Sequence, residues 1–85
     1  MKKWVYANVL NDSVVSTLKE NEIETVLDFA KYDMCVSMTS RETFFHRQTI
    51  EYRLKRVKEK TGLDPHKFYD LMKLVHSLEK VDGKM

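Results

Sequence analysis

The chain is poor in the residues that cross-link a small domain or interrupt its helices. Its 85 residues include one cysteine, two glycines and one proline. A single cysteine excludes a disulfide framework and a CxxC motif, so a reducing, cytoplasmic setting is expected. We interpret Cys35, between Met34 and Val36, as a small buried hydrophobic residue. Scarce glycine and proline favour helices over short strands.

Long hydrophobic runs and catalytic patterns are also missing. No apolar run approaches the roughly 18 residues that a membrane span requires, so no membrane association is expected. The start, MKKWVYANVL, is too short and broken an apolar run for a signal peptide, and Asp12 follows it. The histidines His46, His66 and His76 are far apart, without metal-ligand spacing. We therefore expect no enzyme, no metal, no cofactor and no small-molecule ligand.

Charge is present but unevenly distributed. The formal net charge is only +2, yet residues 12–33 carry two lysines against six carboxylates, a net of −4. Residues 41–60 carry seven basic residues against three acidic ones, a net of +4. A basic stripe on one element is typical of nucleic-acid binding, although many charged runs are simply solvated surfaces.

Apolar periodicity predicts an all-α fold, a small bundle of four to five helices. Residues 1–11 have no clear pattern, and Asp12 or Ser13 suits the N-cap of a short helix. Asn21 is the expected cap of a second helix, which ends near Tyr32. Apolar residues recur along one face of it, with Phe29 beside them: Ile23, Val26, Leu27 and Ala30.

A short third helix is expected before the basic stretch. Ser37 or Thr39 can cap it, and Thr39 with Glu42 fits the capping box S/T-x-x-E. A break near Phe45–His46 then separates it from a long basic helix. Two helices joined by a tight turn are the arrangement of a helix-turn-helix, which we predict for residues 38–61.

A C-terminal helix is predicted for residues 64–81. Gly62 stands just past the long helix, where a left-handed residue is favoured. Asp64 suits the cap of the last helix and Pro65 its first turn. The apolar stripe of that helix consists of Phe68, Leu71, Met72, Val75 and Leu78. The chain is therefore interpreted as a single domain.

The long helix of residues 47–61 divides into two faces on a helical wheel. Its inward face is apolar, with Ile50, Leu54, Val57 and Thr61. Its outward face begins with an amide and a phenol and then becomes cationic, with Gln48, Tyr52, Lys55 and Glu59. Gln can bond an adenine edge and Arg a guanine edge, whereas Thr, Tyr and Lys suit phosphates.

The residues also resemble a known family. TVLDFA, then TFF before HRQTIEYRLKRV, and then TGLD follow one another without a gap between residues 22 and 64. This pattern is similar to the C-terminal helix-turn-helix domain of the PucR family of bacterial regulators, which implies the same fold and DNA binding. Gln48 replaces a usual Asn of that family, Ser40 a small Ala and Cys35 a frequent Asn. The family's large sensing domains are not part of these 85 residues, which are either a free-standing domain or a fragment of a larger regulator, so ligand sensing is not implied.

We therefore predict sequence-specific binding of double-stranded DNA in transcription regulation, with the long helix in the major groove. Base edges are assigned to Arg47, Gln48 and Tyr52. Phosphates are assigned to His46, Thr49, Arg53, Lys55 and Arg56. The location expected for such a protein is cytoplasmic and nucleoid-associated. The alternatives are a helix-turn-helix-like module that binds an acidic protein partner, and a plain structural bundle.

The N-terminal segment carries a heavy apolar load. It contains Trp4, Tyr6, Val9, Leu10, Val14 and Val15. Two interpretations remain open. These residues either cover the core or form a homodimer interface that pairs two recognition helices on successive half-sites.

Overall fold

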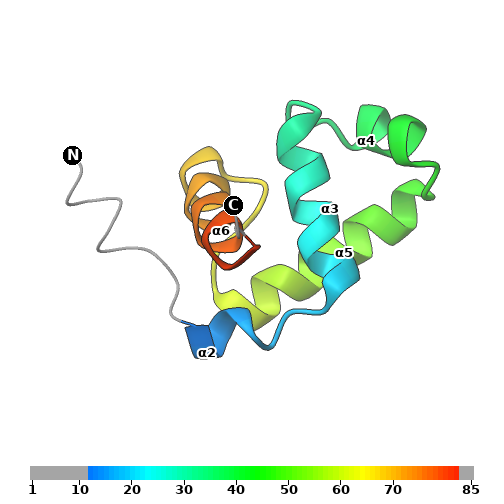
Figure 1. Cartoon of the computed structure of the whole chain (residues 1–85). Coiled ribbons are helices and arrows are strands. Elements are labelled where there is room, and N and C mark those ends of the chain that lie inside the picture. The colour runs from blue at the N-terminus through cyan, green and yellow to red at the C-terminus, as the bar shows by residue number, and fades with distance from the viewer. Residues whose placement is uncertain (1–11, 83–85) are drawn as a thin grey trace.

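The computed structural model describes residues 12–82, which form five helices and no strand (Figure 1). The helices are α2 (Asp12–Val15), α3 (Glu20–Lys31), α4 (Val36–Thr43), α5 (Arg47–Thr61) and α6 (Phe68–Asp82). The predicted all-α helix-turn-helix bundle is confirmed. Within this range, no helix has the length and apolar character needed to cross a bilayer. The N-terminal apolar residues 1–11 lie outside the described residues.

The long helix α5 is the base on which three of the other described helices pack. It contacts α2, α3 and α4, while α6 packs against α3 and α2 (Figure 1). The other four described helices supply buried apolar side chains to one shared core, and α4 adds the partly buried Val36. The buried core residues are Val15, Val26, Phe29, Ile50, Leu54, Val57, Leu71, Leu74 and Leu78, with Leu18 of the α2–α3 loop. The predicted inward residues Ile50, Leu54 and Val57 are at most 1% exposed, which confirms the orientation of α5.

Helix α3 begins earlier than the sequence pattern predicted. Asn21 was expected to be the cap, but Lys19 holds that position and Asn21 lies in the first turn. The Glu22 carboxylate accepts the Lys19 backbone N–H at 2.9 Å, so an acid inside the helix satisfies its start. The end at Tyr32 is confirmed. Phe29 is a core residue at 1% exposure, not a neighbour of the core face.

Helix α4 is capped by the cysteine. Neither Ser37 nor Thr39 is the cap, because the helix begins at Val36 and the Cys35 sulfur accepts the Met38 N–H at 3.4 Å. Thr39 is buried, and its hydroxyl donates to the Cys35 carbonyl at 2.8 Å, so it has no role in a capping box. The prediction that Cys35 is buried is also wrong, since its capping position leaves it exposed.

The loop between α5 and α6 begins with the predicted left-handed glycine, but α6 starts later than predicted. Gly62 has the expected left-handed backbone, with φ of 80°. Asp64 accepts the His66 N–H at 3.0 Å and its carbonyl accepts the Lys67 N–H at 2.9 Å, which closes a turn instead of starting the helix. Helix α6 therefore begins at Phe68, four residues later than predicted.

The buried stripe of α6 differs from the predicted one. Leu71 and Leu78 are buried as expected, and Leu74, which was not predicted, is fully buried. Phe68 and Met72 are 58% and 41% exposed. Helix α6 thus turns the Leu71–Leu74–Leu78 edge toward α3 and α2, which leaves two of the predicted apolar positions at the surface.

Candidate nucleic-acid interface

The outward face of α5 is held rigidly by its buried side. Gln48, Tyr52 and Lys55 are all exposed, opposite the buried Ile50 and Leu54. Tyr52 stands out because its side chain is 62% exposed on an otherwise polar surface. A phenol offers both an apolar ring and a hydrogen-bonding hydroxyl, so this face can contact a partner through more than charge.

The N-terminus of α5 is open. The His46 carbonyl accepts the N–H groups of Thr49 and Ile50 at 3.0 and 3.1 Å, but the His46 side chain makes no cap hydrogen bond. The first turn also contains no acidic residue. Uncapped N–H groups at the positive end of a helix dipole favour an anion such as phosphate.

The turn between α4 and α5 is closed by side-chain hydrogen bonds. The hydroxyl of the half-buried Ser40 donates to the Phe45 carbonyl at 2.7 Å. The Phe45 N–H donates to the Thr43 hydroxyl at 3.4 Å. Ser40, at the position of the family's usual Ala, therefore adds a bond that fixes the start of α5.

Arg47 and Lys55 of α5 form no ion pair within the described residues. Glu51, four residues along the helix from each of them, has its Oε1 3.6 Å from His66 Nε2. Glu59 pairs with Arg56 at 2.9 Å. Among the ion pairs of residues 12–82, none includes Arg47 or Lys55. Both remain available to an anionic partner.

Arg53 is held inward, unlike the other predicted cations. Its side chain is half-buried, with Nη1 3.4 Å from the Thr25 hydroxyl of α3. Its guanidinium also lies 4.5 Å from the centroid of the Phe45 ring. Arg53 therefore joins α5 to α3 and to the turn, and Thr49 is half-buried as well. Of the remaining predicted contacts, Arg56 is also half-buried, and five are exposed, namely His46, Arg47, Gln48, Tyr52 and Lys55.

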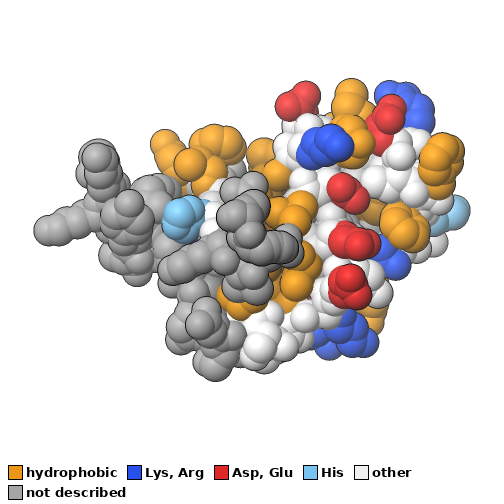
Figure 2. Space-filling view, viewed as in Figure 1, with side chains coloured by type: hydrophobic (Ala, Val, Ile, Leu, Met, Phe, Trp, Pro, Cys, Tyr) orange, Lys and Arg blue, Asp and Glu red, His pale blue; other side chains and the backbone are white. Residues whose placement is uncertain are grey.

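Acidic side chains lie on another helix. Glu20, Glu24 and Asp28 follow one another every four residues along α3, and Figure 2 shows acidic side chains in a row down one face. Such a row repels a polyanion, whereas the outward face of α5 has cations free to attract it. The charge asymmetry predicted from sequence is therefore a separation between two surfaces of the fold.

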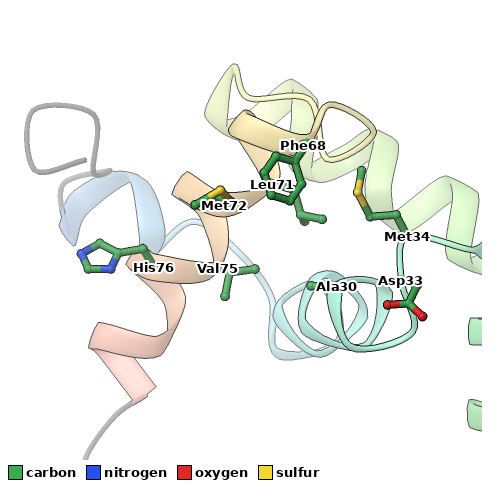
Figure 3. Close-up of a pocket in the computed structure, with 8 residues that line it drawn as sticks. All are labelled: Ala30, Asp33, Met34, Phe68, Leu71, Met72, Val75 and His76. Carbon is green, nitrogen blue, oxygen red and sulfur yellow. The ribbon is translucent and has the colours of Figure 1, made fainter. Parts of the chain in front are cut away.

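A groove lies between α3 and α6. It has a volume of about 490 Å³, and apolar side chains such as Met34, Phe68 and Met72 line it (Figure 3). Asp33 and His76 lie at opposite ends (Figure 3). No residue of α4 or α5 lines this groove, so it is separate from the outward face of α5. No set of three metal-binding side chains gathers within the described residues.

One exposed residue next to the start of α5 was not singled out from the sequence. Phe44, in the turn before α5, is 92% exposed. The signal available in the sequence was the pair Phe44–Phe45 at a tight turn, where two neighbouring rings cannot both face the core. Helical periodicity ends at this turn, so it could not show which ring points outward.

Comparison with known proteins points to one family. The family model described as the PucR C-terminal helix-turn-helix domain matches residues 23–79. The carbohydrate diacid regulator of Escherichia coli (strain K12) is 49% identical to this chain over 41 residues. That alignment covers 48% of this chain and 11% of the regulator, so the chain spans a small part of that relative. No solved structure matches the chain.

Proposed function

The chain belongs to the family of PucR C-terminal helix-turn-helix domains, and on that premise we propose that it binds double-stranded DNA sequence-specifically in transcription regulation. The observation that carries the proposal is the outward face of α5. Its N-terminus is uncapped, and Arg47 and Lys55 are exposed without a described ion-pair partner. These features supply the attraction for phosphates that DNA binding requires.

Helix α5 is the proposed recognition helix, with its N-terminal half in the major groove. Arg47, Gln48 and Tyr52 are the proposed contacts to base edges. Arg47 can bond guanine and Gln48 adenine through two hydrogen bonds, and the Tyr52 ring can lie against a thymine methyl group. All three are exposed, so none needs to leave the core to reach DNA.

Phosphate contacts are proposed for the residues around Arg47, Gln48 and Tyr52. Lys55 is free to act as a point charge, and His46 stands at the uncapped helix start. Arg56 can contribute once DNA competes with Glu59, since their pair is a surface one with side chains 39% and 48% exposed. Thr49 and Arg53 are half-buried, and Arg53 must exchange its contact with Thr25 for a phosphate.

An acidic protein is the alternative partner for the same face. Its binding would also use Arg47 and Lys55, and it would also weaken with salt. A homodimer through the N-terminal apolar segment is proposed for its residues 1–11, which lie outside the described structure, because Val15 of the same segment is buried in the core. A cytoplasmic, nucleoid-associated location follows from the proposed DNA target.

Titration of a labelled duplex at several salt concentrations tests the proposal. The three cations proposed to contact phosphates, Arg53, Lys55 and Arg56, give a slope of log K against log salt of roughly −3. Failure to bind any duplex at low salt would refute DNA binding. Binding to acidic polymers and duplexes with equal affinity and no sequence preference would instead favour the protein-partner alternative.

Two substitutions separate sequence specificity from the affinity that all duplexes share. Gln48→Ala should cost about 1–3 kcal/mol on the preferred site and little on other duplexes, which relaxes specificity. Lys55→Ala should weaken binding to all duplexes about equally and make the salt slope shallower by about one unit. The matched control is Lys31→Ala on the acidic helix α3, which should change neither. Equal effects of Gln48→Ala and Lys55→Ala on every duplex would contradict these roles.

A further inference from the structure

Phe44 is the most exposed of the large hydrophobic side chains in the described structure. Its 92% exposure exceeds the 62% of Tyr52 and the 40% of Phe45, the next residue. A scattered exposed apolar residue is common on soluble proteins and needs no explanation by itself. The backbone at Phe44, however, is left-handed. Asp33 and Met34 are the other non-glycine residues of the described structure with such a backbone, and Phe44 is the one of the three with an aromatic side chain.

The backbone of Phe44 is left-handed, with φ of 65° and ψ of 17°. This conformation costs a residue with a side chain about 1 kcal/mol, and glycine avoids most of that cost. The same chain uses glycine for the same task at the end of α5, where Gly62 has φ of 80°. An aromatic ring thus stands where the fold alone would favour glycine, and such retained strain is frequent at functional positions.

The turn that carries the ring is well determined. The Phe44 N–H donates to the Ser40 carbonyl at 2.9 Å, and the Ser40 hydroxyl donates to the Phe45 carbonyl at 2.7 Å. The Phe45 ring lies under the Arg53 guanidinium, 4.5 Å from its centre. Bonds on both sides therefore hold the left-handed residue in place and leave its ring in solvent.

Cationic residues flank this ring in the sequence. Arg41 precedes Phe44 by three residues in the last turn of α4, and Arg47 opens α5 three residues after it. Residues 41–47 hold two arginines and His46 against one carboxylate, Glu42. An apolar ring between cations fits a partner whose apolar groups lie between anions. Duplex DNA is such a partner, since thymine methyl groups and deoxyriboses lie between its phosphates.

We propose that Phe44 is a DNA-binding residue whose ring packs against an apolar part of the duplex, a thymine methyl group or a deoxyribose, beside the site of α5. The inference rests on the proposed DNA-binding function and adds a contact of different chemistry to it. Arg47 and Lys55 release counterions when they bind, whereas a phenyl ring releases none. The contribution of Phe44 is therefore independent of salt, and that property separates it from the charged contacts.

The decisive variant is Phe44→Gly, which removes the ring and relieves the left-handed strain together. Its stability in urea should equal or exceed that of the wild-type chain, so a loss of binding cannot be attributed to unfolding. With a duplex selected from a random pool, its affinity should fall about tenfold or more, as expected for a phenyl ring that DNA no longer buries. The slope of log K against log salt should stay unchanged. Phe44→Tyr keeps the ring and should restore most of the affinity.

Phe68→Ala is the matched control, since it removes a 58% exposed phenyl group from α6, away from α4 in Figure 1. It should leave DNA affinity unchanged. Replacing single thymines of the duplex by deoxyuracil removes one methyl group at a time. If one replacement weakens the wild-type chain and not Phe44→Gly, the contact is a thymine methyl group. If no replacement does so while Phe44→Gly still binds weakly, the contact is a deoxyribose.

Three results would overturn the inference. The first is a DNA affinity of Phe44→Gly within twofold of the wild-type affinity. The second is a loss of DNA affinity in Phe68→Ala as large as that in Phe44→Gly, and the third is a shallower salt slope for Phe44→Gly. Each would show that Phe44 makes no apolar contact with DNA. In these cases the wild-type chain still binds DNA and the proposed function stands. A wild-type chain that binds no duplex refutes the proposed function first, and this inference with it.

Discussion

Replacing Lys60 by methionine should lower the free energy of unfolding by about 3 kcal/mol, because it leaves the Glu22 carboxylate buried without its cation. Lys60 Nζ lies 2.8 Å from Glu22 Oε1, and their side chains are 17% and 5% exposed. The same ammonium donates to the Thr17 carbonyl at 3.1 Å. One lysine thus ties the end of α5 to the start of α3 and to the loop before it.

The size of the effect follows from burial. Removing one partner of a buried pair costs about 3–5 kcal/mol, and the lower end applies here because Glu22 keeps the Lys19 N–H at 2.9 Å. For a domain of this size, 3 kcal/mol corresponds to a fall in Tm of roughly 12–24 °C. Methionine keeps the apolar stem of Lys60, so the loss reports mainly the charge.

The pH dependence of stability follows from the same pair. Burial by itself raises the pKa of Glu22, but the Lys19 N–H and the Lys60 ammonium outweigh burial and hold the pKa below its ordinary value of 4.5. A carboxylate with a lowered folded pKa stabilises the fold above its unfolded pKa, and this stability is lost as pH falls through the folded pKa. Wild-type stability should therefore fall below about pH 4.5, and Glu22→Gln should remove the part that Glu22 contributes.

Urea unfolding followed by far-UV circular dichroism, repeated across pH, measures both effects. The matched control is Lys58→Met, which removes a surface pair with Asp64 at 3.7 Å in which the lysine side chain is 59% exposed. That variant should lose less than about 1 kcal/mol. A loss below about 1 kcal/mol for Lys60→Met as well would show that the Glu22–Lys60 pair does not stabilise the fold as its burial implies.

Three further substitutions test the core, a helix end and the turn by the same urea assay. Leu54→Ala should cost about 2–5 kcal/mol, because Leu54 is 1% exposed at the centre of α5, and a loss below about 1 kcal/mol would contradict its place in the core. Gly62→Ala should cost about 1 kcal/mol from its φ of 80° alone, since an added Cβ would meet no atom within 4 Å, and an equally stable variant would disprove that strain. Ser40→Ala should cost about 0.5–1 kcal/mol by removing the hydrogen bond to the Phe45 carbonyl, and a more stable variant would show that this bond does not hold the turn.

The helices were predictable where apolar periodicity was long. Residues Ile50, Leu54 and Val57 form an unbroken stripe on a helix of 15 residues, and all three are buried. Prediction was weaker at helix starts, because several polar residues near each start can cap. At α4 the N-cap is Cys35, whose sulfur accepts a backbone N–H, and neither Ser37 nor Thr39 caps the helix. Thr39 is buried instead, with its hydroxyl bonded to the Cys35 carbonyl.

The polar outward face of α5 was predictable from residue type, and the DNA-binding roles of its residues stay predictions. The pattern around residues 46–56 pointed to one helix with a polar outward face, and its exposure agrees. Which cations are free was not predictable, because that depends on partners remote in sequence. Glu51 lies 3.6 Å from His66 and is in no ion pair with Arg47 or Lys55 within the described residues, and Thr25 holds Arg53 inward across 28 positions of the chain.

The sequence by itself determined the all-α class, the helix-turn-helix, the inward stripe of α5 and the separation of charge between α3 and α5. These properties are local, since periodicity, turn residues and charge runs act within one or two helical turns. Only the tertiary structure decided that Phe44 faces solvent while Phe45 supports Arg53, and that Leu74 replaces Phe68 in the core. Those choices depend on the neighbouring helices, because a side chain is buried only where another element covers it.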